Sequence, residues 1–272
     1  MHDLKIYIPT FRRVDNQITF CNLPNKYKQN VIMVVQEQER EQYKYDCEYL
    51  IVDNNIGIAK TREIIYRDAG KNRFAMLDDD LTIFRRNRKY FGETVNMDVS
   101  KRKMLEEDFD YMINDFNTVM DNDDVILVGM RDTSLPPHGE KYYYNSLVLQ
   151  AFFIDGSKLT KFIDDIDWNY VKTGEDTLIN LECLIRGFRN VITDEFMMNG
   201  KENFGKEGGC SEFRDVMSDE KEHMKLVEKY GNHIIKPLND FYNNRLGRAR
   251  KFKIDCKTAY KSSQLNTLES FI

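Results

Sequence analysis

The chain has 272 residues, of which 41% are hydrophobic and 31% charged, and its formal net charge at pH 7 is −5. It contains no low-complexity tract and no apolar run near the roughly 20 residues that cross a bilayer, so we expect a globular protein without a transmembrane segment. The N-terminus lacks the basic and apolar regions of a secretory signal. Five scattered cysteines without CxxC spacing predict reduced thiols in a cytoplasmic protein rather than disulfides or a zinc site.

The first half of the sequence alternates between strand-like and helix-like segments. Short apolar runs predict strands over 4–9, 30–36, 49–54, 74–80 and 124–130. Helical spacing of apolar residues predicts helices over 57–70 and 103–122. Near-continuous apolar strands are typical of a parallel sheet that is covered on both faces, so this half predicts an α/β fold.

The second half is less regular. The order predicted there is a loop over 131–146, a strand over 147–155, a helix over 175–187, a strand over 190–196, a glycine-rich loop over 199–213 and a helix over 218–231. No internal repeat or linker is evident. We therefore expect one α/β domain over 1–240 and a basic C-terminal extension over 241–272.

The extension differs from the rest of the chain in charge. It carries only two acidic residues, Asp255 and Glu269, against seven basic ones: Arg245, Arg248, Arg250, Lys251, Lys253, Lys257 and Lys261. The remaining residues are strongly acidic overall. The extension therefore either meets an anionic partner or forms a solvated helix that neutralises its own domain, and charge does not separate these interpretations.

Polar residues follow four of the predicted strands, at Pro9–Arg12, Asp53–Asn55, Asp78–Asp80 and Met130–Asp132. The carboxyl ends of parallel strands meet at one edge of a sheet, which is where such folds bind ligands. The sequence has neither a GxGxxG motif after a strand nor a GxxxxGK[ST] motif, which argues against dinucleotide-binding Rossmann proteins and P-loop NTPases.

Three adjacent aspartates follow one buried strand. In an extended chain Asp78 and Asp80 would point to one side and Asp79 to the other. Two neighbouring carboxylates form a hard-oxygen site for Mg²⁺ or Mn²⁺ that phosphate oxygens can complete. A solvated turn or a helix N-cap is the alternative explanation.

A second acidic pair, Glu175 and Asp176, follows Thr173-Gly174 at the start of a helical pattern. Negative charge is stabilised at a helix N-terminus, so this position has a complete structural explanation. The pair is also suited to general-base chemistry.

Five segments in this order, IYIPTFRR, YLIVDNN, GIAKTRE, AMLDDDL and GEDTLINLECLIRGFR, resemble GT-A-fold nucleotide-sugar glycosyltransferases. The resemblance covers about residues 5–190 and implies a Rossmann-like α/β fold with a mixed, mainly parallel sheet flanked by helices. It also implies a nucleotide-sugar donor, with a UDP-sugar favoured, and a bound Mn²⁺ or Mg²⁺.

The resemblance implies that the donor is bound by Pro9, Thr10, Arg12, Asp53, Lys60, Arg62, Asp78 and Asp79. Within this set, Lys60 and Arg62 would face the diphosphate near a helix N-terminus, although a solvated helix face also explains them. Asp80, together with Asp78, would bind the metal. Asp176, with Glu175 as its rival, would be the general base of an inverting reaction.

Two further assignments lie outside the five matching segments. Lys206, in the glycine-rich segment 205–211, could close over the diphosphate. Trp168 and the tyrosines at 142–144 could stack on a sugar or base, although buried aromatic residues are the commoner explanation.

The acceptor is suggested by the basic extension and by a finer likeness to phage-type DNA glycosyltransferases, which act on 5-hydroxymethylpyrimidines and are associated with TET/JBP-type base modification. DNA contacts would then involve Arg245, Arg248, Arg250, Lys251, Lys253 and Lys257. The alternatives are a cytoplasmic enzyme that glycosylates a cell-surface glycan or lipid-linked precursor and a non-catalytic nucleotide- or nucleic-acid-binding module. No feature predicts an oligomeric state.

Overall fold

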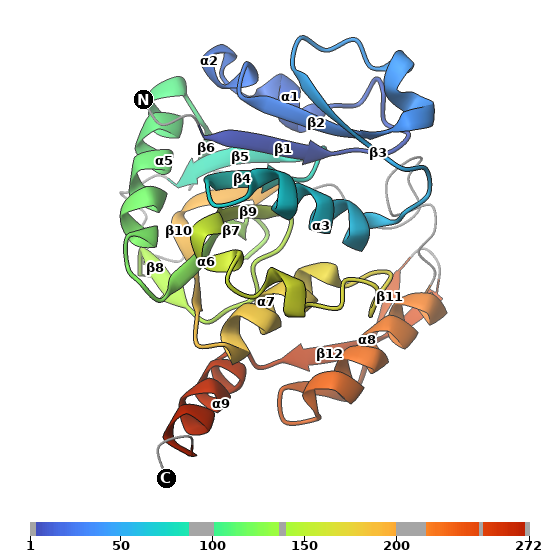
Figure 1. The fold of residues 1–272 in the computed structure, drawn as a ribbon, viewed down its shortest axis with the longest axis vertical. Helices are drawn as coiled ribbons and strands as arrows, with labels where there is room; N and C mark the ends of the chain where they lie inside the picture. The colour runs from blue at the N-terminus through green and yellow to red at the C-terminus, as the bar shows by residue number, and fades with distance from the viewer. Residues whose placement is uncertain (1–3, 87–100, 136–139, 200–215, 245–246, 270–272) are drawn as a thin grey trace.

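The structure, a computed structural model, describes residues 4–86, 101–135, 140–199, 216–244 and 247–269. Its centre is a sheet with helices on both faces (Figure 1). The strand order is β3 (Glu48–Val52), β2 (Val31–Gln36), β1 (Lys5–Pro9), β4 (Arg73–Leu77), β9 (Ala151–Asp155), β7 (Val125–Asp132), β10 (Arg189–Asn199), β5 (Thr82–Arg86) and β6 (Lys101–Lys103), with β8 (Tyr142–Tyr144) beside β10.

The strand directions confirm a mixed, mainly parallel sheet. Among the described strands, β9, β5 and β8 run against the other seven. The block β3-β2-β1-β4 is parallel throughout, so its carboxyl ends share one edge. β9 is antiparallel to β4 and therefore begins at that edge.

Helices cover the sheet on both sides. One face is packed by α3 (Ile58–Ala69), α6 (Gly156–Leu159), η3 (Ile163–Asp165) and α7 (Glu175–Ile185). α8 (Val216–Tyr230) and α9 (Cys256–Glu269) extend the same apolar core beyond α7. The other is packed by α1 (Ile18–Asn22), α2 (Asn25–Lys28) and α5 (Glu106–Met120), while η1 (Glu37–Gln42) joins β2 to β3.

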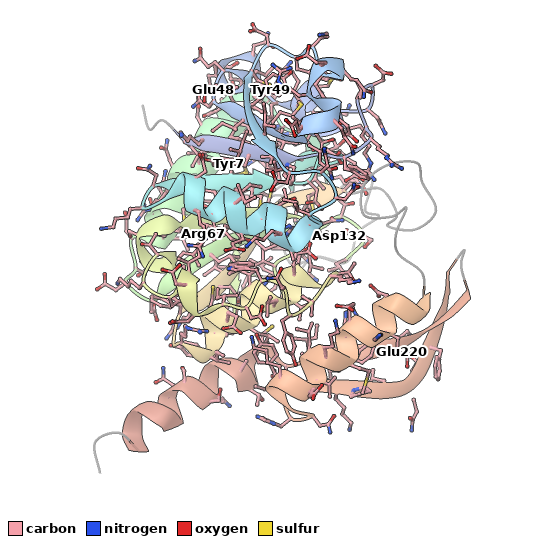
Figure 2. All side chains as sticks on the ribbon, turned by 45° about the vertical axis from the view of Figure 1, so that its right-hand side comes forward. Tyr7, Glu48, Tyr49, Arg67, Asp132 and Glu220 are labelled. Carbon is pink, nitrogen blue, oxygen red and sulfur yellow. The ribbon has the colours of Figure 1, made fainter. Side chains whose placement is uncertain are left out.

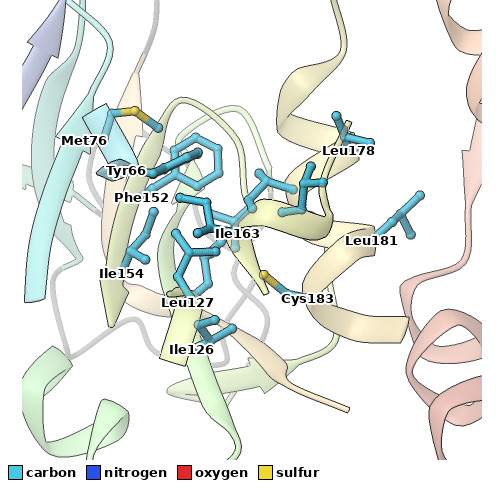
Figure 3. Packing of buried hydrophobic residues seen from close by; sticks show 14 of the residues in the cluster. Tyr66, Met76, Ile126, Leu127, Phe152, Ile154, Ile163, Leu178, Leu181 and Cys183 are labelled. Carbon is cyan, nitrogen blue, oxygen red and sulfur yellow. The ribbon is translucent and has the colours of Figure 1, made fainter. Parts of the chain in front are cut away.

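Strand alternation explains the two apolar cores. In β4, Phe74 and Met76 join the cluster under α3 and α7, whereas Ala75 and Leu77 join the cluster under α5. Figure 3 shows the first cluster, in which Leu178 of α7 lies across from the sheet residues. Burial on both faces is the reason that these strands are almost continuously apolar.

Three predicted segments differ from the structure. The strand predicted over 74–80 ends at Leu77, and the chain turns at Asp79 and Asp80 before β5. The predicted loop over 131–146 contains β8, which pairs with β10. Most of the predicted loop over 199–213 lies outside the described residues, as does Lys206.

The C-terminal part forms a hairpin and a helix. β11 (Ile235–Asn244) and β12 (Gly247–Ile254) pair antiparallel and pack on α8, which Figure 2 marks at Glu220. α9 packs on α7 and contributes Cys256 and Ala259 to the core. The boundary predicted after residue 240 falls within β11. In the described part of the chain, no helix is both long and apolar enough to cross a membrane.

Candidate active site

A cavity of about 840 Å³ lies at the carboxyl ends of β1 to β4. It is closed by the start of α3, the start of α7 and the segment 168–173. Nine predicted site residues line it: Pro9, Thr10, Lys60, Arg62, Asp78, Asp79, Asp80, Glu175 and Asp176. Residues far apart in the sequence thus meet at the edge where ligands bind in such sheets.

Arg62 joins the two acidic segments. It projects from α3, is only 3% exposed, and lies over the ring of Phe152. Its Nη2 is 3.1 Å from Asp78 Oδ1 and 3.3 Å from Glu175 Oε1, and its Nη1 pairs with Asp176. One buried guanidinium therefore holds the end of β4 against the start of α7.

Arg13 holds the other two aspartates. Its Nη1 lies 2.5 Å from Asp79 Oδ1 and 3.1 Å from Asp80 Oδ2. Thr10 Oγ1 donates to Asp79 Oδ2 at 2.7 Å. The prediction that Asp79 alone points away from Asp78 and Asp80 assumed an extended chain and was wrong in that respect, because the turn places Asp79 and Asp80 on one arginine.

The cavity carries more negative than positive charge. The acidic side chains that line it are Asp78, Asp79, Asp80, Glu175, Asp176 and Glu222, and the basic ones are Arg13, Lys60, Arg62 and Lys172. Burial raises the pKa of Asp78 to about 7, with Arg62 opposing the shift and the charges of Asp80, Asp79 and Glu175 adding to it. Burial likewise raises the pKa of Asp79 against the effect of Arg13.

The residues present fit a divalent cation. Asp78 and Asp80 each pair with an arginine through one oxygen, and their second oxygens make no hydrogen bond or ion pair among the described residues. No set of three or more His, Cys, Asp or Glu side chains in the described ranges forms a ready metal site. Two carboxylates that leave the remaining positions to water and phosphate are typical of Mg²⁺ or Mn²⁺ sites.

Both helices that point into the cavity begin at glycine. α3 follows Gly57 (φ 80°) and α7 follows Gly174 (φ 85°), a conformation that glycine adopts without strain. Residues 56–62 line the cavity, so the amide groups at the start of α3 face it. Glu175 and Asp176 form the first turn of α7, as predicted.

Some predicted site residues lie elsewhere or are otherwise engaged. Arg12 lines a second cavity, of about 760 Å³, beside the first. Asp53 is exposed at the end of β3 and does not line either cavity. Lys60 lines the main cavity, but its Nζ donates to Glu63 Oε2 at 2.5 Å.

Sequence reasoning missed several lining residues, including Arg13, Gln36, Gln150 and Glu222. Gln150 is notable because it has a φ of 61°, which is uncommon for a residue with a side chain. Its carbonyl accepts from the Asp78 N–H at 2.9 Å, and its own N–H lies 3.4 Å from Asp176 Oδ2. The only sequence signal was its place within the strand predicted over 147–155.

The predicted aromatic residues divide into two groups. Trp168 lines the cavity but is 3% exposed and packs on Tyr66, so its ring belongs mainly to the core. The tyrosines of β8 pair with β10 and do not line the cavity.

The basic residues of the C-terminal part are described only in part. Lys251 and Lys253 are exposed on β12, alternating with Phe252 and Ile254, which pack on the core. Lys257 is exposed on α9. The side chains of Arg248 and Arg250, and all of Arg245, lie outside the described residues.

The family described as TET-Associated Glycosyltransferase matches residues 4–209. No curated protein sequence matches the chain. Glucosyl-3-phosphoglycerate synthase from Mycobacterium tuberculosis, solved with Mn²⁺, UDP and phosphoglyceric acid, has 8% identity and a TM-score of 0.47, over 94% of this chain and 90% of that one. A mycobacterial protein has 11% identity and a TM-score of 0.46, over 94% and 87%.

These structural similarities are too low to carry an argument about function. The family match, by contrast, spans about three quarters of the sequence and includes every cavity residue except Glu222. This chain therefore belongs to the TET-associated glycosyltransferase family.

Proposed function

We propose that this glycosyltransferase moves a sugar from a UDP-sugar to the hydroxymethyl group of a modified pyrimidine in phage DNA, with Mn²⁺ or Mg²⁺ bound. The observation that carries the proposal is the meeting of two acidic segments at one cavity. Arg62 contacts Asp78, Glu175 and Asp176, and Arg13 holds Asp79 and Asp80 at the same cavity. The family's association with TET supports the choice of acceptor.

The donor would occupy the cavity beside α3. Pro9 and Thr10 line the cavity and would contact the nucleoside, and Arg12 and Asp53 remain predicted contacts from outside the lining. The amides at the start of α3 favour the diphosphate, and Lys60 can reach it by leaving Glu63. A divalent cation held by Asp78 and Asp80 would supply charge neutralisation for the departing diphosphate.

Asp176 is the better placed general base. Its side chain is 17% exposed, against 5% for Glu175, so an acceptor hydroxyl can reach it more easily. Asp176 would accept the hydroxyl proton while the hydroxyl oxygen bonds to the anomeric carbon and the bond from that carbon to the diphosphate oxygen breaks. A direct displacement of this kind inverts the anomeric centre.

Basic residues of the C-terminal part would contact the DNA acceptor. Lys251, Lys253 and Lys257 are exposed, as contacts with a phosphate backbone require. Cys21, Cys47, Cys183 and Cys256 are free thiols, which supports action in a reducing cytoplasm.

The test is transfer to duplex DNA that contains 5-hydroxymethylcytosine or 5-hydroxymethyluracil, with UDP-sugars and Mn²⁺, followed by mass spectrometry of the nucleosides. The same duplex with 5-methylpyrimidines is the matched control, because it lacks only the hydroxyl group. We expect glycosylated nucleosides from the hydroxymethylated duplex alone. Transfer to a lipid-linked or glycan acceptor, with none to DNA, would refute the DNA assignment.

A further inference from the structure

In the part of the chain that the structure describes, two oxygen atoms beside the start of α7 have no hydrogen-bond partner. Glu175 is 4% exposed, and its Oε2 is buried without a donor among the described residues. Thr173 Oγ1 is in the same situation, two residues earlier. Both residues line the main cavity. Buried polar atoms are nearly always satisfied in folded proteins, so a pair without partners in a cavity points to a ligand.

Two other buried glutamates, Glu182 outside the cavity and Glu222 at its wall, are supplied with partners. Glu182, on the same helix, pairs with Lys229 at 2.8 Å and with Arg186, and it accepts from Tyr230. Glu222 accepts the Lys172 N–H at 2.6 Å and lies 2.9 Å from Lys225 Nζ. Glu175 has only its Oε1 engaged, with Arg62. Among these three glutamates, only Glu175 leaves a buried oxygen without a partner in the described part of the chain.

The chemistry of this pair selects the kind of ligand. A carboxylate oxygen can only accept a hydrogen bond, whereas a threonine hydroxyl can both donate and accept. Asp78 and Asp176 are held on the same arginine as Glu175, and this negative charge disfavours a phosphate there. An uncharged group with hydroxyls, such as a pyranose ring, complements all of these features.

We propose that Glu175 and Thr173 form the subsite that recognises hydroxyl groups of the donor sugar by hydrogen bonding. Glu175 is then a specificity residue rather than a base. This inference rests on the proposed function, because it places the sugar of a nucleotide sugar in this cavity. It assigns different tasks to two adjacent carboxylates: Glu175 recognises the sugar and Asp176 takes the acceptor proton.

The experiment is isothermal titration with Mn²⁺ of UDP and of a panel comprising UDP-glucose, UDP-galactose and UDP-N-acetylglucosamine. In the wild type we expect at least one UDP-sugar to bind more tightly than UDP. Glu175→Gln replaces the accepting Oε2 by a donating amide. It should therefore lower the affinity for that UDP-sugar by about tenfold or more and leave the affinity for UDP within about twofold of the wild-type value. Thr173→Val should also lower the affinity for the same UDP-sugar.

Glu182→Gln is the matched control, since it removes an equally buried charge from α7 outside the cavity and should preserve the preference for the sugar. Circular dichroism of each variant establishes that it is folded. If UDP binds but no UDP-sugar binds more tightly, or if Glu175→Gln keeps the wild-type preference or weakens UDP equally, the subsite is refuted while the nucleotide site stands. If UDP does not bind the wild type, the UDP-sugar function itself fails, and the subsite with it.

Discussion

Two groups of buried ion pairs lie on the same sheet and differ in their charge balance. In the Arg62 cluster, one arginine contacts Asp78, Glu175 and Asp176. In the second group, here called the β10 cluster, five cations meet four carboxylates: Arg85, Arg86, Arg102, Arg131 and Lys141 with Asp108, Asp115, Asp194 and Glu195. None of these nine residues lines the main cavity.

The difference appears in the ionisation of the two clusters. Burial acts against ionisation of Asp108, yet hydrogen bonds from Arg102, the Leu105 N–H and Arg85 lower its pKa. Burial raises the pKa of Asp78 to about 7 despite the opposing effect of Arg62, and the charges of Asp80, Asp79 and Glu175 add to the shift. In the β10 cluster five cations face four carboxylates, whereas in the Arg62 cluster one cation faces three carboxylates, which leaves room for another cation.

The largest effect is expected from removing that cation. With EDTA, or in Asp80→Ala, we expect no measurable sugar transfer, because the diphosphate would then depart without charge neutralisation. Added Mn²⁺ should restore the EDTA-treated wild type but not the variant, measured as initial rates. Full activity in EDTA would show that sugar transfer does not require a metal ion.

Asp176→Asn should be the next most damaging change. Loss of a general base lowers turnover by about 10²- to 10⁴-fold, and the amide keeps the shape of the side chain. Donor affinity should stay near the wild-type value, so kcat falls while the dissociation constant for UDP does not change. Normal kcat in this variant would exclude Asp176 as the base.

The two clusters can be compared through the free energy of unfolding of the variants Arg62→Met and Arg86→Met. Removing one partner of a buried ion pair costs about 3–5 kcal/mol, so both variants should unfold at lower denaturant concentration. Mn²⁺ should recover part of the loss in Arg62→Met only, because the three carboxylates left there can bind it. Equal recovery in both variants would mean that the Arg62 cluster has no special affinity for cations.

A smaller effect is expected from pH. The pKa of Asp78 is higher in the folded chain than in the unfolded one, so the folded state holds an extra proton between about pH 4 and 7 and loses stability as the pH rises through this range. Asp78→Asn imitates the protonated form. In EDTA, its unfolding temperature relative to wild type should therefore be higher near pH 8 than near pH 5. A difference that does not vary with pH would contradict the raised pKa.

The sequence predicted which segments would meet, but not how their side chains would pair. The ends of the strands before Asp53 and Asp78 could be predicted, because a run of apolar residues is a local feature of the sequence. The pairing of Arg13 with Asp79 crosses 66 positions and depends on a turn that alternation does not reveal. Arg62 was expected to face a phosphate, and only the packing of α3 against α7 shows that it holds carboxylates.

Glu222 illustrates the same limit. Its helix was evident from amphipathic spacing, but its contact with Lys172 at the cavity wall depends on how α8 packs against the segment before α7. A tertiary contact of this kind cannot be predicted from the sequence of either segment alone.

The proposed function requires that Asp78–Asp80 and Glu175–Asp176 form one metal-dependent site for a nucleotide sugar. The most direct measurement is the unfolding temperature with UDP, with and without Mn²⁺, for the wild type and Asp80→Ala. Because a ligand that binds the folded state stabilises it, UDP should raise the wild-type value only when Mn²⁺ is present, and this increase should disappear in Asp80→Ala. An equal increase in EDTA, or an unchanged increase in the variant, would contradict this requirement.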